Sequence, residues 1–202
     1  MAKALWLILF TGTLVWSAVN PRDYPTWALE VAPAVVALVV LALTYESFRL
    51  TSLVYWLILA HCLVLMVGGH YTYAEVPLFD TLRPLFGWER NNYDKLGHIM
   101  QGFVPAMVGR EILIRKHVVT SPAWRNFFIV CFCLALSAFY ELLEWWVALA
   151  AGASSEAFLA TQGYEWDTQS DMAFALAGAV SALALLGNWH DRQLRKLAYE
   201  RT

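Results

Sequence analysis

Charged residues are scarce in this chain of 202 residues. Asp, Glu, Lys and Arg together make up 15% of it, whereas 59% of its residues are hydrophobic. Soluble domains carry about 25% charged residues, so this composition excludes an ordinary soluble domain and an intrinsically disordered chain. The chain also lacks a basic patch, and its formal net charge is −2. The absence of such a patch excludes a domain that binds nucleic acid.

Cysteine is equally rare, and no disulfide framework is expected. The three cysteines lie inside apolar runs: Cys62, Cys131 and Cys133. Residues two positions apart point to different sides of a helix, so we interpret all three as small buried residues rather than as a disulfide or a metal pair. The chain also contains no phosphate-binding loop, nucleotide fingerprint, nucleophile elbow or internal repeat.

Long uncharged runs take the place of these features. A hydrocarbon core about 30 Å thick is crossed by roughly 20 mostly apolar residues of helix, and several runs reach or approach this length. We therefore predict an all-α, polytopic membrane protein with one integral membrane domain over residues 1–202. Turn-forming residues predict the connecting loops, among them 74–93 and 152–168. The six expected transmembrane helices span about residues 4–19, 27–44, 51–72, 94–114, 124–150 and 169–188.

Lys and Arg are distributed unevenly between the two sets of loops. With the N-terminus inside, ten of them fall on the cytoplasmic side and four on the other side. Positive charge favours the cytoplasmic side, so we predict that both termini are cytoplasmic. The loop 152–168 contains no Lys or Arg, as expected for an outer loop. The first run follows Lys3 and has features of a signal peptide, but we expect it to remain as an uncleaved span.

Ionisable residues recur at one depth of the predicted bundle. Asp94 and His98 share a face of the fourth helix because they are four positions apart. Glu141 and Glu144 share a face near the outer end of the fifth helix, and Asp171 lies in the first turn of the sixth. Three helices that run in alternating directions thus bring their acids together on the extracytoplasmic side. Ionisable residues inside a membrane usually face a protein interior or a wet cavity.

A cluster of carboxylates in a low dielectric needs either protons or a cation. Imidazole with carboxylates is a common ligand set for zinc, manganese or iron, so we predict a divalent metal centre. A structural network of hydrogen-bonded side chains is the alternative. The expected metal-binding residues are Asp94 (as ligand or partner of a ligand), His98, Glu141, Glu144 and Asp171, and the expected pocket-lining residues are His70, Gln101, Asp167 and Gln169.

Four segments of the chain resemble the YjdF-type family of bacterial inner-membrane proteins. They are NNYDKLGH at 91–98, REIL at 110–113, FYELLEWW at 139–146 and TQGYEWDTQSDM at 161–172. This resemblance covers most of the chain and implies a multi-pass protein of the bacterial inner membrane. A fainter resemblance, to the VanZ-like membrane proteins, rests on Asp94-Lys95-x-x-His98, Glu141-x-x-Glu144 and Asp171, although Gln usually stands there in place of Glu144.

These observations favour three functions. The first is a metal-assisted hydrolase or transferase that acts on a lipid or envelope substrate, with Glu144 moving a proton. The second is a divalent-cation or proton-coupled transporter, against which stand the missing internal repeat and the presence of only His61 as a polar candidate in the inner half. The third is a structural membrane subunit with a buried polar network. Membrane lipids are the partners common to all three.

Overall fold

The structure is a computed structural model that describes residues 2–151 and 164–199. These residues form helices joined by short loops, which confirms the predicted all-α class. Residues 152–163 of the predicted outer loop lie outside the described ranges. The described helices are α1 (Ala2–Ala18), α2 (Tyr24–Thr44), α3 (Ser52–Tyr71), α4 (Pro77–Phe86), α5 (Tyr93–Arg115), α6 (Pro122–Ala151) and α8 (Asp167–Tyr199).

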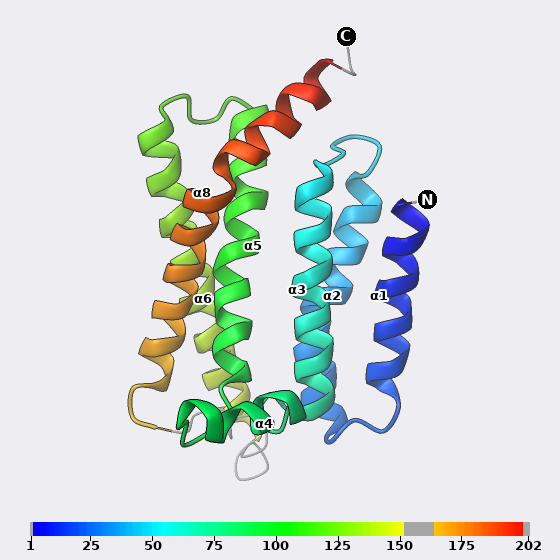
Figure 1. Cartoon of the computed structure of the whole chain (residues 1–202), viewed down its shortest axis with the longest axis vertical. Helices are drawn as coiled ribbons and strands as arrows, with labels where there is room; N and C mark the ends of the chain where they lie inside the picture. Colours follow the sequence, from blue (N-terminus) through cyan, green and yellow to red (C-terminus); the bar gives the residue numbers. More distant parts are fainter. Residues whose placement is uncertain (1, 152–163, 200–202) are drawn as a thin grey trace.

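The long helices form a bundle of two halves (Figure 1). In one half α1 and α2 pack against α3, and in the other α5, α6 and α8 pack against one another. The contact between α3 and α5 joins the halves. The start of α1 and the end of α8 lie at the same end of the bundle, whereas the short helix α4 lies across the opposite end (Figure 1).

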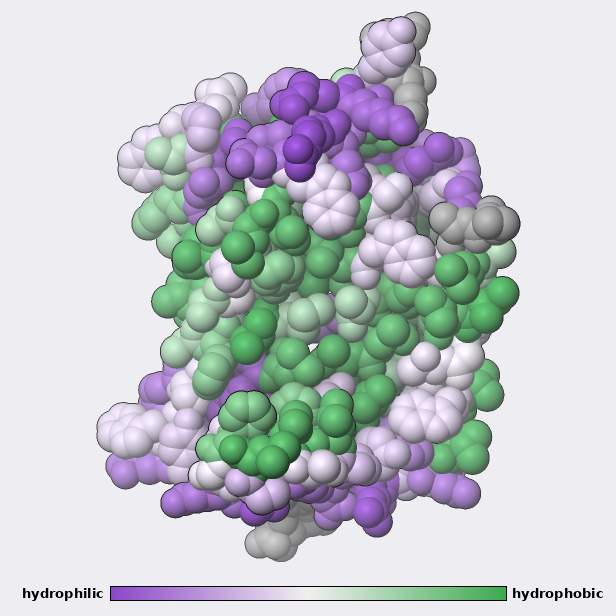
Figure 2. Space-filling model, in the orientation of Figure 1, coloured by the Kyte–Doolittle hydropathy of each residue, from purple (hydrophilic) through white to green (hydrophobic). Residues whose placement is uncertain are grey.

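Four of the described helices are long and apolar enough to cross a membrane: α2, α3, α6 and α8. The apolar helix α1 is shorter, and α5 is not among the four. Figure 2 shows an apolar belt between two polar ends of the molecule. The protein is therefore a polytopic membrane protein, as predicted.

The predicted loop 74–93 is wrong in part because it contains the helix α4. Pro77 lies at the start of α4, and Gly87 ends it with a φ of 65°. Proline in the first turn and glycine just past the last turn are helix boundary signals, although the same residues also indicate loops. The end of the last helix also differs, because α8 continues to Tyr199 rather than stopping at residue 188.

Close packing of α5 against α8 determines how the two helices face each other. A Cβ atom on Gly102 would overlap the backbone of Ala175, and one on Gly178 would overlap the carbonyl of Ile99. Small residues let helix backbones approach closely in membranes. This contact lies about two to three turns from the first residues of both helices, so it brings those residues together.

The start of α5 is held in place by Asn91. Its Oδ1 accepts a hydrogen bond from the backbone N of Tyr93 over 3.1 Å, and its Nδ2 donates to the carbonyl of Val76 and to Oδ1 of Asp80, both over 3.0 Å. One side chain thereby connects α4 to the first turn of α5. The depth of Asp94, one residue into that turn, follows from this connection.

Candidate metal centre

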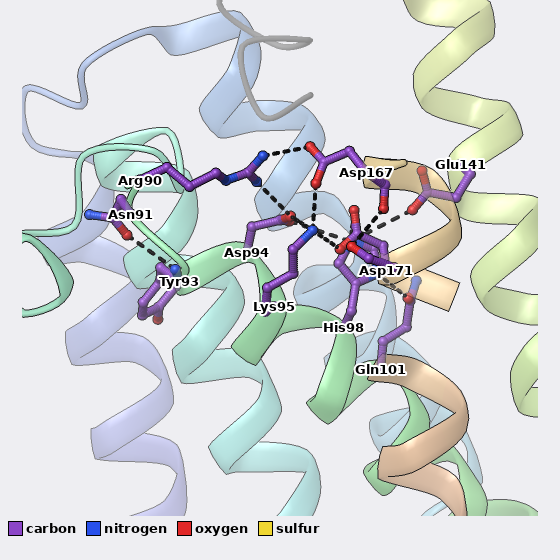
Figure 3. Close-up of polar contacts among 11 residues, drawn as sticks. Arg90, Asn91, Tyr93, Asp94, Lys95, His98, Gln101, Glu141, Asp167 and Asp171 are labelled. Atoms are coloured by element: carbon purple, nitrogen blue, oxygen red, sulfur yellow. Dashed lines mark hydrogen bonds and ion pairs between the residues drawn. The ribbon is translucent and has the colours of Figure 1, made fainter. Parts of the chain in front are cut away.

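Three carboxylates surround one imidazole nitrogen at the end of the bundle that carries α4 (Figure 3). Nε2 of His98 lies 3.3 Å from Oδ1 of Asp94, 3.7 Å from Oε1 of Glu141 and 3.7 Å from Oδ2 of Asp171. All four residues are buried, with exposed fractions between 5% and 7%. They come from α5, α6 and α8, so the sequence prediction that three helices meet at this depth agrees with the structure.

The other nitrogen of His98 has its own partner. Nδ1 lies 3.0 Å from Oε1 of Gln101, one turn further along α5. The amide oxygen can only accept, so Nδ1 donates in this contact. Nε2 is then free either to bind a metal or to carry a second proton between the carboxylates. A metal-binding histidine usually donates its other N–H to an oxygen in this way.

Two cations that were not among the predicted site residues also belong to the cluster. Nζ of Lys95 lies 2.5 Å from Oδ1 of Asp167 and 2.5 Å from Oδ1 of Asp171. NH1 of Arg90 lies 2.9 Å from Oδ2 of Asp167. The predicted pocket residue Asp167 is thus bound to two cations rather than facing His98. Asp167 and Asp171 are four positions apart and share a face at the start of α8. This pair of acids was the signal in the sequence that a lysine could lie opposite them.

Negative charge still exceeds positive charge in the cluster. Without His98, the described residues of the cluster include two cations, Arg90 and Lys95, and four carboxylates. The carboxylates are those of Asp94, Glu141, Asp167 and Asp171. Two of the buried oxygens, Oδ2 of Asp94 and Oε1 of Glu141, have no hydrogen-bond partner among the residues that the structure describes. A low dielectric makes such an excess costly. The cluster therefore favours either an added proton or an added cation.

Two of the distances between these ligand atoms suit a small divalent cation. Bonds of about 2.1 Å in tetrahedral geometry place two ligand atoms about 3.4 Å apart, and the distances from His98 Nε2 to Asp94 and Asp171 bracket this value at 3.3 and 3.7 Å. Ligand atoms of these three residues all lie within 4.8 Å of one another. The buried group of Asp94, His98 and Asp171 could therefore bind a metal ion.

A cavity of about 240 Å³ lies beside His98, between α2, α3, α5 and α6. Glu30 of α2 and Glu144 of α6 both line it, with exposed fractions of 6% and 8%. The Tyr140 hydroxyl donates to Oε2 of Glu30 over 3.0 Å, which connects α6 to α2. Burial raises the pKa of the Tyr73 phenol, also in the lining, well above its ordinary value, so this phenol stays protonated.

Three of the predicted site residues lie elsewhere. Glu144 lines the cavity and does not belong to the group of ligand atoms found among the described residues. The ring of His70 packs against Trp16 with centroids 4.5 Å apart, and its Nδ1 lies 3.0 Å from the carbonyl of Ser17. Gln169 is exposed on α8. His70 and Gln169 are therefore not brought to the centre.

A second buried polar cluster lies at the opposite ends of α5 and α8. Glu111 and His190 are fully buried. The Glu111 carboxylate accepts hydrogen bonds from the Thr51 hydroxyl at 2.7 Å, from Arg115 at 2.7 Å and from Nε2 of His190 at 3.1 Å. Arg110 donates to Nδ1 of His190 over 3.0 Å, so Nε2 carries the proton. From the sequence, the two arginines are predicted only to be cytoplasmic charges.

These features are those of a multi-pass membrane protein with buried ionisable clusters. The family described as "Predicted membrane protein (DUF2238)" matches residues 2–192, and the chain belongs to this family. It is 46% identical over 189 residues to "Inner membrane protein YjdF" of Escherichia coli (strain K12), which covers 94% of this chain and 90% of that protein. The chain is therefore a YjdF-like, multi-pass inner-membrane protein, as its motifs implied. No solved structure matches it significantly.

Proposed function

We propose that this protein is a metal-dependent hydrolase or transferase of the inner membrane, acting on a lipid or envelope substrate. The observation that carries the proposal is the arrangement of Asp94, Glu141 and Asp171 around Nε2 of His98. A buried imidazole that faces three carboxylates, with its other nitrogen bound to an amide oxygen, is the arrangement expected of a metal site. The adjoining cavity supplies the space for a substrate.

We infer that the site opens to the extracytoplasmic side of a single membrane domain with six spans. The spans are α1, α2, α3, α5, α6 and α8, which alternate in direction (Figure 1). The ends of the bundle opposite the site carry nine of the thirteen Lys and Arg residues that the structure describes. Positive charge favours the cytoplasm, so both termini are cytoplasmic and the site lies at the outer leaflet.

In the proposed reaction, some residues bind the metal and another accepts a proton. Asp94, His98 and Asp171 hold the cation, which supplies Lewis-acid chemistry for hydrolysis or group transfer. Glu141 is the proton acceptor, because its Oε1 lies 3.7 Å from His98 Nε2 and no described residue forms a hydrogen bond with this oxygen. This assignment replaces Glu144, which lines the cavity instead. A carboxylate beside a metal is well placed to move a proton during water attack.

Metal analysis of protein purified without chelator tests the proposal. We expect about one zinc, manganese or iron ion per chain in the wild type and loss of most of it in His98→Ala and Asp171→Asn. Glu46→Gln is the matched control, because Glu46 is exposed and lies outside the cluster. A metal-free wild type that gains no thermal stability from added zinc, manganese or iron would overturn the proposal.

The second buried cluster favours transport as the other candidate function. Glu111 and His190 place ionisable groups in the inner half, where the sequence analysis expected only His61. Val104 and Met107 of α5, at 3% and 0% exposed, lie in the apolar core between the two clusters, which argues against a continuous polar path. Uptake of manganese or protons by vesicles that contain the protein would favour transport over hydrolysis.

A further inference from the structure

We propose that the cavity beside the metal centre binds a cationic amphiphile, which is an alkyl chain that ends in a protonated amine. Such an amphiphile would be the substrate class of the proposed enzyme. This part of the proposal rests on the proposed function, because it takes the cavity as the place where the substrate binds. The binding itself depends on the lining of the cavity and not on a bound metal.

Most of the cavity wall suits a hydrocarbon chain. Leu65 of α3, Pro105 of α5 and Leu136 of α6 line it. Phe139 and Leu143 of α6 also line it, and they are 48% and 38% exposed. The cavity therefore reaches the face of α6 that contacts lipid, and an alkyl chain can enter from the bilayer. Ligand pockets are typically apolar with a few polar groups that select the ligand.

Acidic side chains predominate in the polar part of the wall. Glu30, Asp94 and Glu144 line the cavity beside the imidazoles of His61 and His98, and none of the described lining residues is Lys or Arg. Lys95, which follows Asp94 in α5, is bound to Asp167 and Asp171. Such a wall attracts an ammonium group and repels a carboxylate or a phosphate. Among amphiphiles with the same alkyl chain, the charge of the wall thus favours the one that ends in an ammonium group.

Glu144 is the carboxylate that remains for the ligand. Asp94 belongs to the metal centre, and Glu30 accepts a hydrogen bond from Tyr140. In the part of the chain that the structure describes, no group donates a hydrogen bond to Glu144, which is nevertheless 92% buried (8% exposed). A buried carboxylate without a donor is costly, and an ammonium group with three donors satisfies it. The position of Glu144 therefore places the amine of the ligand.

Photolabelling tests this binding. The probe is a dodecylamine that carries a diazirine in its chain, added to the protein in phosphatidylcholine nanodiscs. We expect labelled peptides from the segment of α6 between Leu136 and Leu143. Unlabelled dodecylamine should suppress this labelling at concentrations at least tenfold lower than dodecanol, and dodecanoic acid should be the weakest competitor. Equal competition by the amine and the acid would overturn the proposal.

The variant Glu144→Gln keeps the size of the side chain and removes its charge. We expect at least a tenfold loss of labelling, with metal content unchanged, whereas the exposed control Glu46→Gln should match the wild type. Undiminished labelling of Glu144→Gln would overturn the amine site. A wild type that binds no metal but is still labelled would instead overturn the proposed enzyme, and the amine site would remain supported. Suppression by phosphatidylethanolamine nanodiscs would identify a lipid headgroup as the source of the amine, and its absence would identify a free amine.

Discussion

At the scale of single residues, Lys95 holds together the acids of α5 and α8. Its Nζ lies between Asp167 and Asp171, and its side chain is 9% exposed. Removal of one member of a buried ion pair leaves uncompensated charge and costs about 3–5 kcal/mol. We expect Lys95→Met to lower the free energy of unfolding by this amount, measured by denaturant titration in detergent. The control Lys116→Met changes an exposed lysine and should cost less than about 1 kcal/mol.

The same variant distinguishes a metal centre from a purely structural network. With Lys95 removed, the acids carry more net negative charge, so a divalent cation should stabilise Lys95→Met more than it stabilises the wild type. Thermal unfolding with and without added zinc or manganese measures the difference. An equal response of the two proteins would count against a cation between these carboxylates.

Gln101 affects the centre through the far nitrogen of His98. Loss of an oxygen that orients a metal-binding histidine typically weakens metal affinity by about 10–100-fold, and Nδ1 of His98 lies 3.0 Å from Oε1 of Gln101. We expect this loss in Gln101→Leu, measured by competition with a chelator of known affinity. Gln101→Glu retains an acceptor and should retain most of the affinity. Equal affinity in Gln101→Leu and the wild type would show that this contact does not orient the imidazole.

At the scale of helices, the contact between α5 and α8 depends on Gly102. An added methyl group there would overlap the backbone of Ala175, whereas nothing lies within 4 Å of one added at Gly109 of the same helix. Overpacking of this kind costs about 1–3 kcal/mol or more, so Gly102→Ala should destabilise the protein and weaken metal binding. Gly109→Ala should be neutral or slightly stabilising. Similar unfolding curves for the two variants would contradict the close approach of these helices.

The long helices and the common depth of their acids could be predicted from sequence, but α4 and the contacts between residues of different helices could not. Uncharged runs and the spacing of Asp94 and His98 are local signals, and they led to a cluster that the structure shows. The pairing of Lys95 with Asp167 joins residues 72 positions apart, and it depends on how closely α5 approaches α8. The contact of Glu111 with His190 spans 79 positions and depends on the same approach. Local spacing carries no information about such distances between helices.

At the scale of the whole molecule, the proposed orientation places the two clusters on opposite sides of the membrane. Alkaline phosphatase fused after Gly163 should be active, because it folds outside, and the same reporter fused at Thr202 should be inactive. A green fluorescent reporter should give the opposite pattern. If both sites reported the same side, the six-span topology and the outer position of the metal centre would be wrong.

The charges of α5 also constrain how the chain enters the membrane during synthesis. Charged residues make insertion of a helix into the membrane less favourable, by up to about 2.5–3.5 kcal/mol for one at the helix centre, and α5 carries five charged residues, which lie near its two ends. Their partners in α8 begin 52 residues after the end of α5, so the ribosome releases α5 long before those partners exist. We therefore expect α5 to remain beside the translocon until α8 emerges, and a nascent chain truncated after α6 to be degraded. The ion pairs of the finished protein thus determine the order of its assembly. The charges of α5 are on Asp94, Lys95, Arg110, Glu111 and Arg115.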